Sequence, residues 1–519
     1  MSQAATQATD QVSSRRSGGR LARQKQRAAP LAAEVKPVRA GLSGGQYKPL
    51  SEADITAIES TVYQILEEIG LSQAPESGVE YMTKLGAEYG EDGRVRFPRR
   101  LIDHVLSICA RDITLYGKDP AHDLDLSGNR VHFGTAGAAV HMVDITGNSY
   151  RESELKDIYD AARIVDKMDN IHFFQRPMVA RDVTDSIDLD VNTVYACLRG
   201  TNKHIGTSFN EADSVAPTMS LLHDIAGGEE AWRQRPFVSN SNCFVVPPLR
   251  FATESCLVME EVVKAGMPVL LLSAGQAGAT APASIAGAIA QAVAEVLAGL
   301  VYVNAMVPGH PAIAGTWPFV SDLRTGAMSG GSGEQGLLTA ACAQMLGHFG
   351  LPSGAASGMA DAKMPDAQSG YEKGSTAVMA GLAGLNMVYE AAGMHASLLG
   401  FCLESLIIDN DMLGQCLRCV RGVEVTETSL DIQAIKDVCL DGPGHYLGHQ
   451  QTISLMQSEY VYPEVSDRSS PKEWEEKNKP VLVETAMARK DEILNSYFPE
   501  YITAQQDLIL RQRHNILLP

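Results

Sequence analysis

Three consecutive segments between residues 269 and 316 decide the fold: Val269-Leu-Leu-Leu-Ser273, an alanine-rich run from Ser284 to Val307, and Ala312-Ile-Ala-Gly-Thr316. The first and third are short apolar runs of the length typical of buried strands. The second is long enough for a helix, and its larger apolar side chains recur at helical spacing. Strand, helix and strand in this order predict two parallel strands joined by a crossover helix.

The same alternation occurs eight times from about residue 130 onward. The predicted strands are Val131–Phe133, Ile171–Gln175, His204–Thr207, Phe237–Ser241, Val269–Ser273, Ala312–Thr316, Ser353–Ser357 and Asn386–Tyr389. The predicted helices are Glu152–Met168, Ile187–Arg199, Asp213–Ile225, Thr253–Ala265, Ser284–Val307, Glu334–Phe349, Ser369–Ala383 and Ser397–Val420. Eight units of roughly equal length favour closure into a barrel over an open sheet. No glycine-rich phosphate-binding motif follows the first strand, which weakens a nucleotide-binding alternative.

The predicted fold class is therefore α/β, a (β/α)8 TIM barrel with N-terminal and C-terminal helical extensions. We assign residues 130–421 to the barrel, 50–129 to an N-terminal helical region and 422–519 to a C-terminal helical cap. Residues 1–49 are predicted to be a disordered or extended basic tail, with an arm that packs on a neighbouring subunit as the alternative.

The alanine-rich run is also long enough to suggest a membrane span. Gln291, Glu295 and Asn304 interrupt it, and it is rich in Ala and Gly rather than in Leu and Ile. We therefore predict a buried packing helix and no association with a membrane.

The composition excludes some partners and indicates a compartment. The net charge of −19 opposes non-specific binding to the phosphate backbone of nucleic acids and is compatible with a cationic ligand. Nine cysteines in 519 residues make no disulfide framework, which favours a reducing cytoplasm. The single CxxC pair, Cys416 and Cys419, lies in a predicted helix without a second pair, so no metal site is predicted.

Candidate site residues follow from the rule that a barrel of this type carries its reacting groups at the carboxyl ends of its strands. If the ligand is a cation without hydrogen-bond donors, as a quaternary ammonium is, a site would hold it with aromatic faces and nearby negative charge. The aromatic residues at or near predicted strand ends are Phe133, Phe174, Phe244, Trp317, Phe319 and Tyr389. Glu390 and Asp361 are the acidic candidates. Each of these residues alone could instead belong to the core or to a structural ion pair.

Several long stretches resemble the trimethylamine methyltransferase superfamily. They are Val131-His-Phe-Gly-Thr-Ala-Gly137, Ser321 to Gly331, Leu351 to Lys373, Asn386-Met-Val-Tyr-Glu-Ala-Ala-Gly393, and Gly444-His-Tyr-Leu-Gly-His-Gln-Gln-Thr452. The resemblance runs from about Leu50 to near the end of the chain. It implies a barrel enzyme that transfers a methyl group to the Co(I) corrinoid of a separate partner protein, with no tightly bound cofactor of its own.

The resemblance also bears on the substrate. The named archaeal members carry pyrrolysine in the loop after the seventh strand, and the resemblance places Met359 of this chain at that position. A member without pyrrolysine is similar to the glycine betaine methyltransferases, so a quaternary amine is expected rather than trimethylamine. Tetrahydrofolate as the methyl acceptor, or a betaine-binding protein without turnover, are the alternatives, and a homo-oligomer is expected.

For a quaternary amine we assign Trp317, Phe319 and Tyr389 to the cationic head, with Glu390 nearby. If the substrate is a betaine, the candidate donors to its carboxylate are Gln276, Asn240, His395 and Lys363. No residue is assigned a catalytic role, because a positively charged nitrogen already leaves as a neutral amine. The protein then needs only to position and desolvate the methyl group for in-line attack.

Overall fold

The computed structural model describes residues 32–440 and 442–519. The chain divides into two compact units, of which one contains residues 32–39 with 423–462 and the other 40–422 with 463–519. The basic stretch from Ser13 to Ala29 lies outside the described residues. The segment 422–519, predicted as one helical cap, is distributed over both units.

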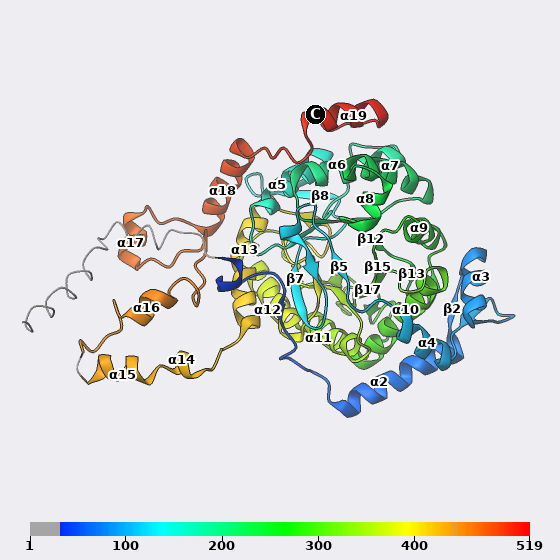
Figure 1. Cartoon of the computed structure of the whole chain (residues 1–519), viewed down its shortest axis with the longest axis horizontal. Helices are drawn as coiled ribbons and strands as arrows, with labels where there is room; N and C mark the ends of the chain where they lie inside the picture. The colour runs from blue at the N-terminus through cyan, green and yellow to red at the C-terminus, as the bar shows by residue number, and fades with distance from the viewer. Residues whose placement is uncertain (1–31, 441) are drawn as a thin grey trace, which may run out of the picture. The chain divides into compact units, whose positions relative to one another are not determined.

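Eight parallel strands form a closed barrel at the centre of the larger unit (Figure 1). They are β7 (Arg130–Phe133), β10 (Phe173–Gln175), β11 (His204–Thr207), β12 (Val238–Asn242), β15 (Val269–Ser273), β17 (Ala312–Thr316), β20 (Ser353–Ala356) and β21 (Met387–Tyr389). β21 pairs in parallel with β7, and a bridge between Gly134 and Phe173 joins the end of β7 to β10 and closes the ring. All eight predicted strands are confirmed within two residues at either end.

Helices connect the strands on the outside of the barrel. They are α5 (Leu155–Asp166), α6 (Ser186–Gly200), α7 (Val215–Ala226), α8 (Glu229–Gln234), α9 (Thr253–Lys264), α10 (Ile285–Met306), α11 (Gly333–His348), α12 (Ala367–Ala383) and α13 (Leu403–Arg421). The predicted start of the last helix at Ser397 is wrong. Ala396, Ser397 and Leu398 all have positive φ, which a helix cannot contain, and they turn the chain between β22 (Met394–His395) and β23 (Gly400–Phe401).

The alanine-rich helix α10 is the apolar centre of the fold. It is long and apolar enough to cross a membrane, but 83% of its most apolar window is buried inside the protein. It contacts β15 and β17 on one side and α2 (Glu52–Gln64), α3 (Glu76–Leu85) and α4 (Arg99–Ile108) of the N-terminal region on the other. Figure 1 shows these three helices beside α10. The prediction of a buried packing helix is confirmed.

Short strands complete the larger unit. One five-stranded sheet joins the N-terminal region to the connection between β12 and α9. The N-terminal region contributes β2 (Leu71–Ser72), β3 (Glu88–Tyr89) and β4 (Arg94–Arg96), and the connection contributes β13 (Val245–Val246) and β14 (Arg250–Phe251). β1 (Leu42–Ser43) pairs with β7, and β5 (Thr114–Leu115) pairs with β6 (Leu124–Asp125). Two further small sheets follow the barrel strands: β16 (Gln276–Ala277), β18 (Phe319–Ser321) and β19 (Met328–Ser329) form one, and β8 (His141–Asp144) and β9 (Ser149–Glu152) join β22 and β23 in the other.

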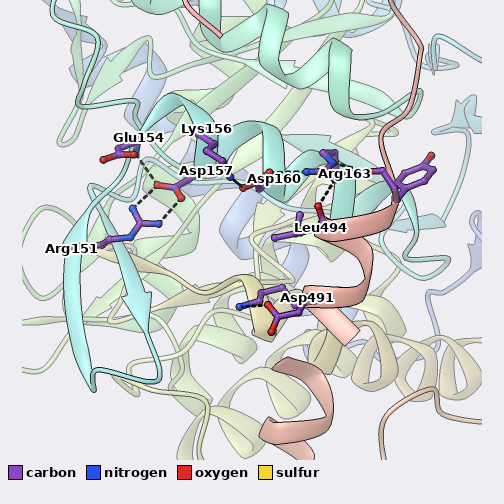
Figure 2. A network of polar contacts seen from close by, with 10 residues as sticks. Arg151, Glu154, Lys156, Asp157, Asp160, Arg163, Asp491 and Leu494 are labelled. Atoms are coloured by element: carbon purple, nitrogen blue, oxygen red, sulfur yellow. Dashed lines mark hydrogen bonds and ion pairs between the residues drawn. The ribbon is translucent and has the colours of Figure 1, made fainter. Parts of the chain in front are cut away.

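The C-terminal helix α18 (Leu482–Ser496) packs against α5 and α13. Figure 2 shows the polar contacts that hold this interface, in which the buried guanidinium of Arg163 is bonded on every side. It donates to Asp160 at 3.0 Å, to the carbonyl of Leu494 at 2.9 Å and to the carbonyl of Tyr497 at 2.8 Å. A charge this well bonded fixes the C-terminal helix to the barrel.

Five more C-terminal helices are divided between the two units. α17 (Pro471–Glu476) and α19 (Ala504–Arg513) lie in the larger unit, whereas the smaller unit contains α14 (Glu427–Leu430), α15 (Ile432–Cys439) and α16 (Gln450–Leu455). In α15, Ala434 and Val438 are buried and recur at the spacing of one helical face. The predicted helical character of residues 422–519 is thus present in both units.

Candidate functional site

The barrel interior is filled by rings that stand beside glycines. Tyr389 is the last residue of β21, and a Cβ at Gly354 of the neighbouring strand would lie 2.9 Å from its Cε2. A Cβ at Gly134 would lie 2.4 Å from the ring of Phe173 on β10. Glycine at these two positions therefore makes the space that the two rings occupy.

Four aromatic side chains meet near the carboxyl ends of β17 and β21, and one of them, Phe173, is the first residue of β10. The Tyr389 ring centroid lies 5.0 Å from that of Phe173 and 5.6 Å from that of Trp317. The ring of Phe319, in β18, lies 6.4 Å from that of Trp317 at an interplanar angle of 82°. The structure thus brings together the three aromatics that the sequence assigned to a cationic head, and we name these four residues the aromatic cluster.

Phe173 was not predicted to belong to this group, whereas its neighbour Phe174 was named. Successive strand residues point to opposite faces, so only one of the two can face the barrel interior. Phe173 contacts Tyr389 there. Phe133 faces outward instead, because a Cβ at Gly381 of α12 would lie 3.3 Å from its Cζ. The strand register, which the sequence does not show, decides between such neighbours.

Glu390 follows Tyr389 directly and is the most unusual residue of the site. Its side chain is completely buried and its φ is +59°, a backbone conformation that side chains other than glycine rarely adopt. Neither carboxylate oxygen has a hydrogen-bond partner among the described residues. Burial raises the pKa of this carboxyl well above its ordinary value. A strained and unbonded buried acid is costly, which makes it a candidate for binding a ligand.

Trp317 also buries a polar atom without a partner in the described part of the chain, its indole Nε1. Gln276 lies next to Phe319, because β16 and β18 pair in parallel with these two residues in register. Its Oε1 accepts a hydrogen bond of 3.1 Å from Ser321 Oγ, and its side chain is half-buried. Gln276 is therefore held beside the aromatic cluster.

Asp361 and Met359 lie in the loop after β20. The carboxylate of Asp361 accepts hydrogen bonds from Ser329 Oγ at 2.6 Å, from the backbone N–H of Gly330 at 2.7 Å and from Ser397 Oγ. Met359 is fully buried, and a Cβ at Gly330 would lie 2.1 Å from its Sδ. Asp361 thus ties three loops together, and its oxygens are already bonded to protein.

Other predicted residues lie away from the aromatic cluster or are bonded. Phe244 packs against Phe251 at 6.3 Å between ring centroids, in the core cluster that contains α10. His395 bonds Ala362 O at 3.3 Å and Ser405 Oγ at 2.7 Å, and burial lowers its pKa well below the ordinary value. Lys363 Nζ donates to Asp361 O at 2.5 Å. Asn240 Oδ1 accepts from Asn242, whose amide also donates to Ser255 of α9 on the outer side of the barrel.

Two residues of strand-end loops, to which the sequence assigned no role, lie at the same end of the barrel. Arg176 follows β10, and Cys243 follows β12 and is exposed. The charges of both Arg176 and Glu390 act on the pKa of the Cys243 thiol, which burial by surrounding protein raises most strongly. A charged residue directly after a barrel strand is the signal that could have identified Arg176.

Within residues 32–440 and 442–519 no group of three or more histidine, cysteine or acidic side chains could hold a metal ion. The described site therefore offers rings, a glutamine amide, a carboxylate and a guanidinium. These groups can bind and orient a charged organic molecule.

Comparisons with known proteins show what the whole chain is similar to. The family described as "Trimethylamine methyltransferase (MTTB)" matches residues 16–513. A glycine betaine methyltransferase from Desulfitobacterium hafniense (strain Y51) is 29% identical over 469 residues, which cover 90% of this chain and 96% of the relative. A trimethylamine methyltransferase from Methanosarcina thermophila is 30% identical, over 80% of this chain and 86% of the relative.

One solved structure shares the fold. The monomethylamine methyltransferase of Methanosarcina barkeri superposes with a TM-score of 0.50 and 11% sequence identity, covering 91% of this chain and 92% of that one. At this identity the similarity shows the fold alone.

Proposed function

Because this chain belongs to the trimethylamine methyltransferase family, we propose that it transfers a methyl group from a quaternary amine, glycine betaine or a related compound, to the Co(I) corrinoid of a partner protein. The observation that carries the choice of substrate is the buried, unbonded carboxylate of Glu390 at the strand end that also presents the aromatic cluster. Negative charge and ring faces together are what a permanent cation requires.

The chain's own residues have a limited task in this reaction. A quaternary nitrogen leaves as a neutral tertiary amine, so its departure requires no proton from the protein. Trp317, Phe319 and Tyr389 would surround the ammonium group and exclude water from it. Holding the nitrogen fixed orients one methyl group for in-line attack.

Glu390 suits this task because it is a single carboxylate. The charge on nitrogen falls as the methyl group leaves, so a cluster of acids would stabilise the bound cation more than the transition state. The oxygens of the other candidate acid, Asp361, already accept hydrogen bonds from three donors of the protein. The Co(I) corrinoid, carried by the partner, would supply the nucleophile that takes the methyl group.

The remaining parts of the proposal concern setting and assembly. The described cysteines are all free, as a reducing cytoplasm would keep them, and we propose a cytoplasmic homo-oligomer. None of the relatives' names favours tetrahydrofolate as the acceptor.

Substitution of Trp317 by alanine tests the proposal. Loss of one ring face should weaken glycine betaine binding by about tenfold in isothermal titration calorimetry, which lies between the values for an exposed and a fully desolvated cation–π contact. Trp474→Ala, which removes a tryptophan of α17 bonded to Pro480 O, is the matched control and should bind as the wild type does.

Turnover is tested separately, by mixing the wild-type protein with glycine betaine and the reduced corrinoid protein. Formation of the methyl-cobalamin absorbance supports the proposal. Tight binding without that absorbance favours a binding protein, and equal affinity of the Trp317 and Trp474 variants would remove the aromatic cluster from the site.

A further inference from the structure

The loop after β10 holds a positive charge that no described acidic side chain neutralises. The backbone N–H of Arg176 donates to Gly206 O at 2.9 Å, which fixes the residue at the end of the strand. Its guanidinium makes one long bond, 3.5 Å from Nη1 to Met178 O. Among residues 32–440 and 442–519, no carboxylate oxygen lies within 4.0 Å of it, unlike the guanidinium of Arg163.

This isolation is unfavourable for an arginine. The guanidinium cannot lose its proton at any physiological pH, so it stays charged however deeply it is placed. Burial lowers its pKa, and Asp190 attracts it from α6. The Asp190 carboxylate, however, already accepts two bonds from Asn210, at 3.0 and 2.9 Å. A buried cation without a direct partner is strongly destabilising unless a ligand supplies the anion.

Arg176 and Glu390 lie on two sides of the same part of the barrel end. A Cβ at Gly137 would be 3.2 Å from the carbonyl oxygen of Pro177, the residue after Arg176, and 3.8 Å from Oε1 of Glu390. Cys243 lies close enough to both side chains that Arg176 lowers and Glu390 raises the pKa of its thiol. Arg176 itself keeps part of its surface accessible although protein surrounds it. The loop that carries Arg176 and the carboxyl group of Glu390 therefore lie beside the same part of the barrel end, and neither side chain has a charged partner in hydrogen-bond contact among the described residues.

We propose that Arg176 binds the carboxylate of the substrate, so that the substrate is a betaine, a molecule with a quaternary ammonium and a carboxylate on a short tether. This rests on the proposed function, in which Glu390 and the aromatic cluster bind the ammonium end. A zwitterion places an opposite charge beside each unpaired group at once, and planar guanidinium bonds a carboxylate through two parallel N–H groups. Of the donors predicted from sequence, Lys363 and His395 are bonded to protein. Gln276 remains to assist Arg176, as does Asn240, whose buried Nδ2 has no hydrogen-bond partner among the described residues.

The test compares four ligands on four forms of the full-length protein. Glycine betaine and carnitine carry the carboxylate, whereas choline and tetramethylammonium do not. The forms are the wild type, Arg176→Gln, Arg176→Lys and Arg181→Gln. Arg181 is the matched control because it lies five residues further along the chain and pairs with Glu152 at 3.1 Å on the surface.

We expect Arg176→Gln to weaken binding of the better betaine by about tenfold to a hundredfold, the range for a lost hydrogen-bonded charge pair. Tetramethylammonium affinity should stay within about twofold, and Arg176→Lys should recover part of the betaine affinity because it restores the charge but not the fork. The melting temperature of ligand-free Arg176→Gln should equal or exceed that of the wild type, since an unpaired charge has been removed.

Three results would overturn the inference. Equal loss of betaine and tetramethylammonium binding in Arg176→Gln would make Arg176 a general structural residue. A lower melting temperature of the ligand-free variant would show that Arg176 already has the partner it needs. If the wild-type protein bound tetramethylammonium as tightly as either betaine, the carboxylate site would be refuted and the proposed function would stand. If it bound none of the four ligands, both would be refuted.

Discussion

The protein buries charge in two different ways, one on the side of the barrel that faces α18 and one at the carboxyl ends of the strands. On the α18 side, Arg163 is bonded to a carboxylate and to two carbonyl oxygens, and Lys203 donates to the carbonyls of Val165, Met168 and Ile171 at 2.7, 2.6 and 2.5 Å. At the strand ends, Glu390 and Arg176 are left without a charged partner among the described residues. Bonded buried charges hold the fold, and unbonded ones at a strand end indicate where a ligand completes the structure.

The largest effect is expected where a bonded charge is broken. Lys373 of α12 donates to Asp409 of α13 at 2.6 Å, and both side chains are buried. Lys373→Met should lower the free energy of unfolding by about 3–5 kcal/mol, because the Asp409 carboxylate stays buried without its cation. Urea unfolding followed by circular dichroism measures the change. The double variant with Asp409→Leu should regain most of it, and a loss below about 1 kcal/mol in the single variant would contradict the comparison.

An intermediate effect separates the two acids of the site. Asp361→Asn replaces a carboxylate that accepts three hydrogen bonds, so we expect a loss of about 2 kcal/mol in unfolding free energy. Its affinity for tetramethylammonium, measured by calorimetry, should remain that of the wild type. If this variant instead lost the cation while its stability stayed unchanged, Asp361 and not Glu390 would be the acidic partner of the ammonium group.

Glu390→Gln should raise the free energy of unfolding relative to the wild type, and the size of this gain should depend on pH. The pKa of Glu390 in the folded protein is raised above its ordinary value of 4.5, so the folded state retains a proton that the unfolded chain releases. The stabilisation that this proton confers is complete below pH 4.5 and is lost as the pH rises through the raised pKa. Because glutamine does not titrate, the unfolding free energy of the variant relative to that of the wild type should rise by about 1.4 kcal/mol per pH unit over that interval.

Thermal unfolding of both forms between pH 4.5 and 8 measures this gain. In the wild type, tetramethylammonium should bind more tightly as the pH rises over the same interval, since the ionised carboxylate is the form that attracts it. A constant difference in stability between the two forms across this range would show that Glu390 has a partner and belongs with the bonded charges.

The smallest effect is expected for a charge that is neither buried nor strained. Arg233 and Glu229 pair at 2.9 Å on α8, and both side chains are about half exposed. Arg233→Gln should change the unfolding free energy by less than about 0.5 kcal/mol, because water screens such a pair. A change in unfolding free energy as large as that expected for Lys373→Met would mean that burial does not decide how much an ion pair stabilises this protein.

Much of the fold could be predicted from the sequence because short apolar runs and helical spacing mark the elements locally. The eight strands and the burial of α10 follow from such patterns. The start of α13 could not be predicted, since nothing in Ser397 or Leu398 announces positive φ in non-glycine residues. The choice between Phe173 and Phe174 depends on which face of a strand meets the interior, and that is set by pairing with distant strands.

The site was predicted only in part for the same reason. Trp317, Phe319 and Tyr389 were named because they stand at strand ends, and the structure brings their rings together. Arg176 was placed in a loop after a strand but was assigned no role, because a sequence shows the charge but not whether an acid lies within reach of it. Phe244 was named for its position after a strand, yet it packs in the core with Phe251.

The position of α10 has a consequence for how the chain must be made. Its apolar surface is covered partly by α2, α3 and α4, which precede it by nearly two hundred residues in the order of synthesis. The N-terminal region has therefore left the ribosome before α10 emerges and is ready to receive it. A chain that begins after Ile108 would leave the α2–α4 face of α10 uncovered on a helix apolar enough to enter a bilayer, and such a fragment should aggregate or partition into membranes.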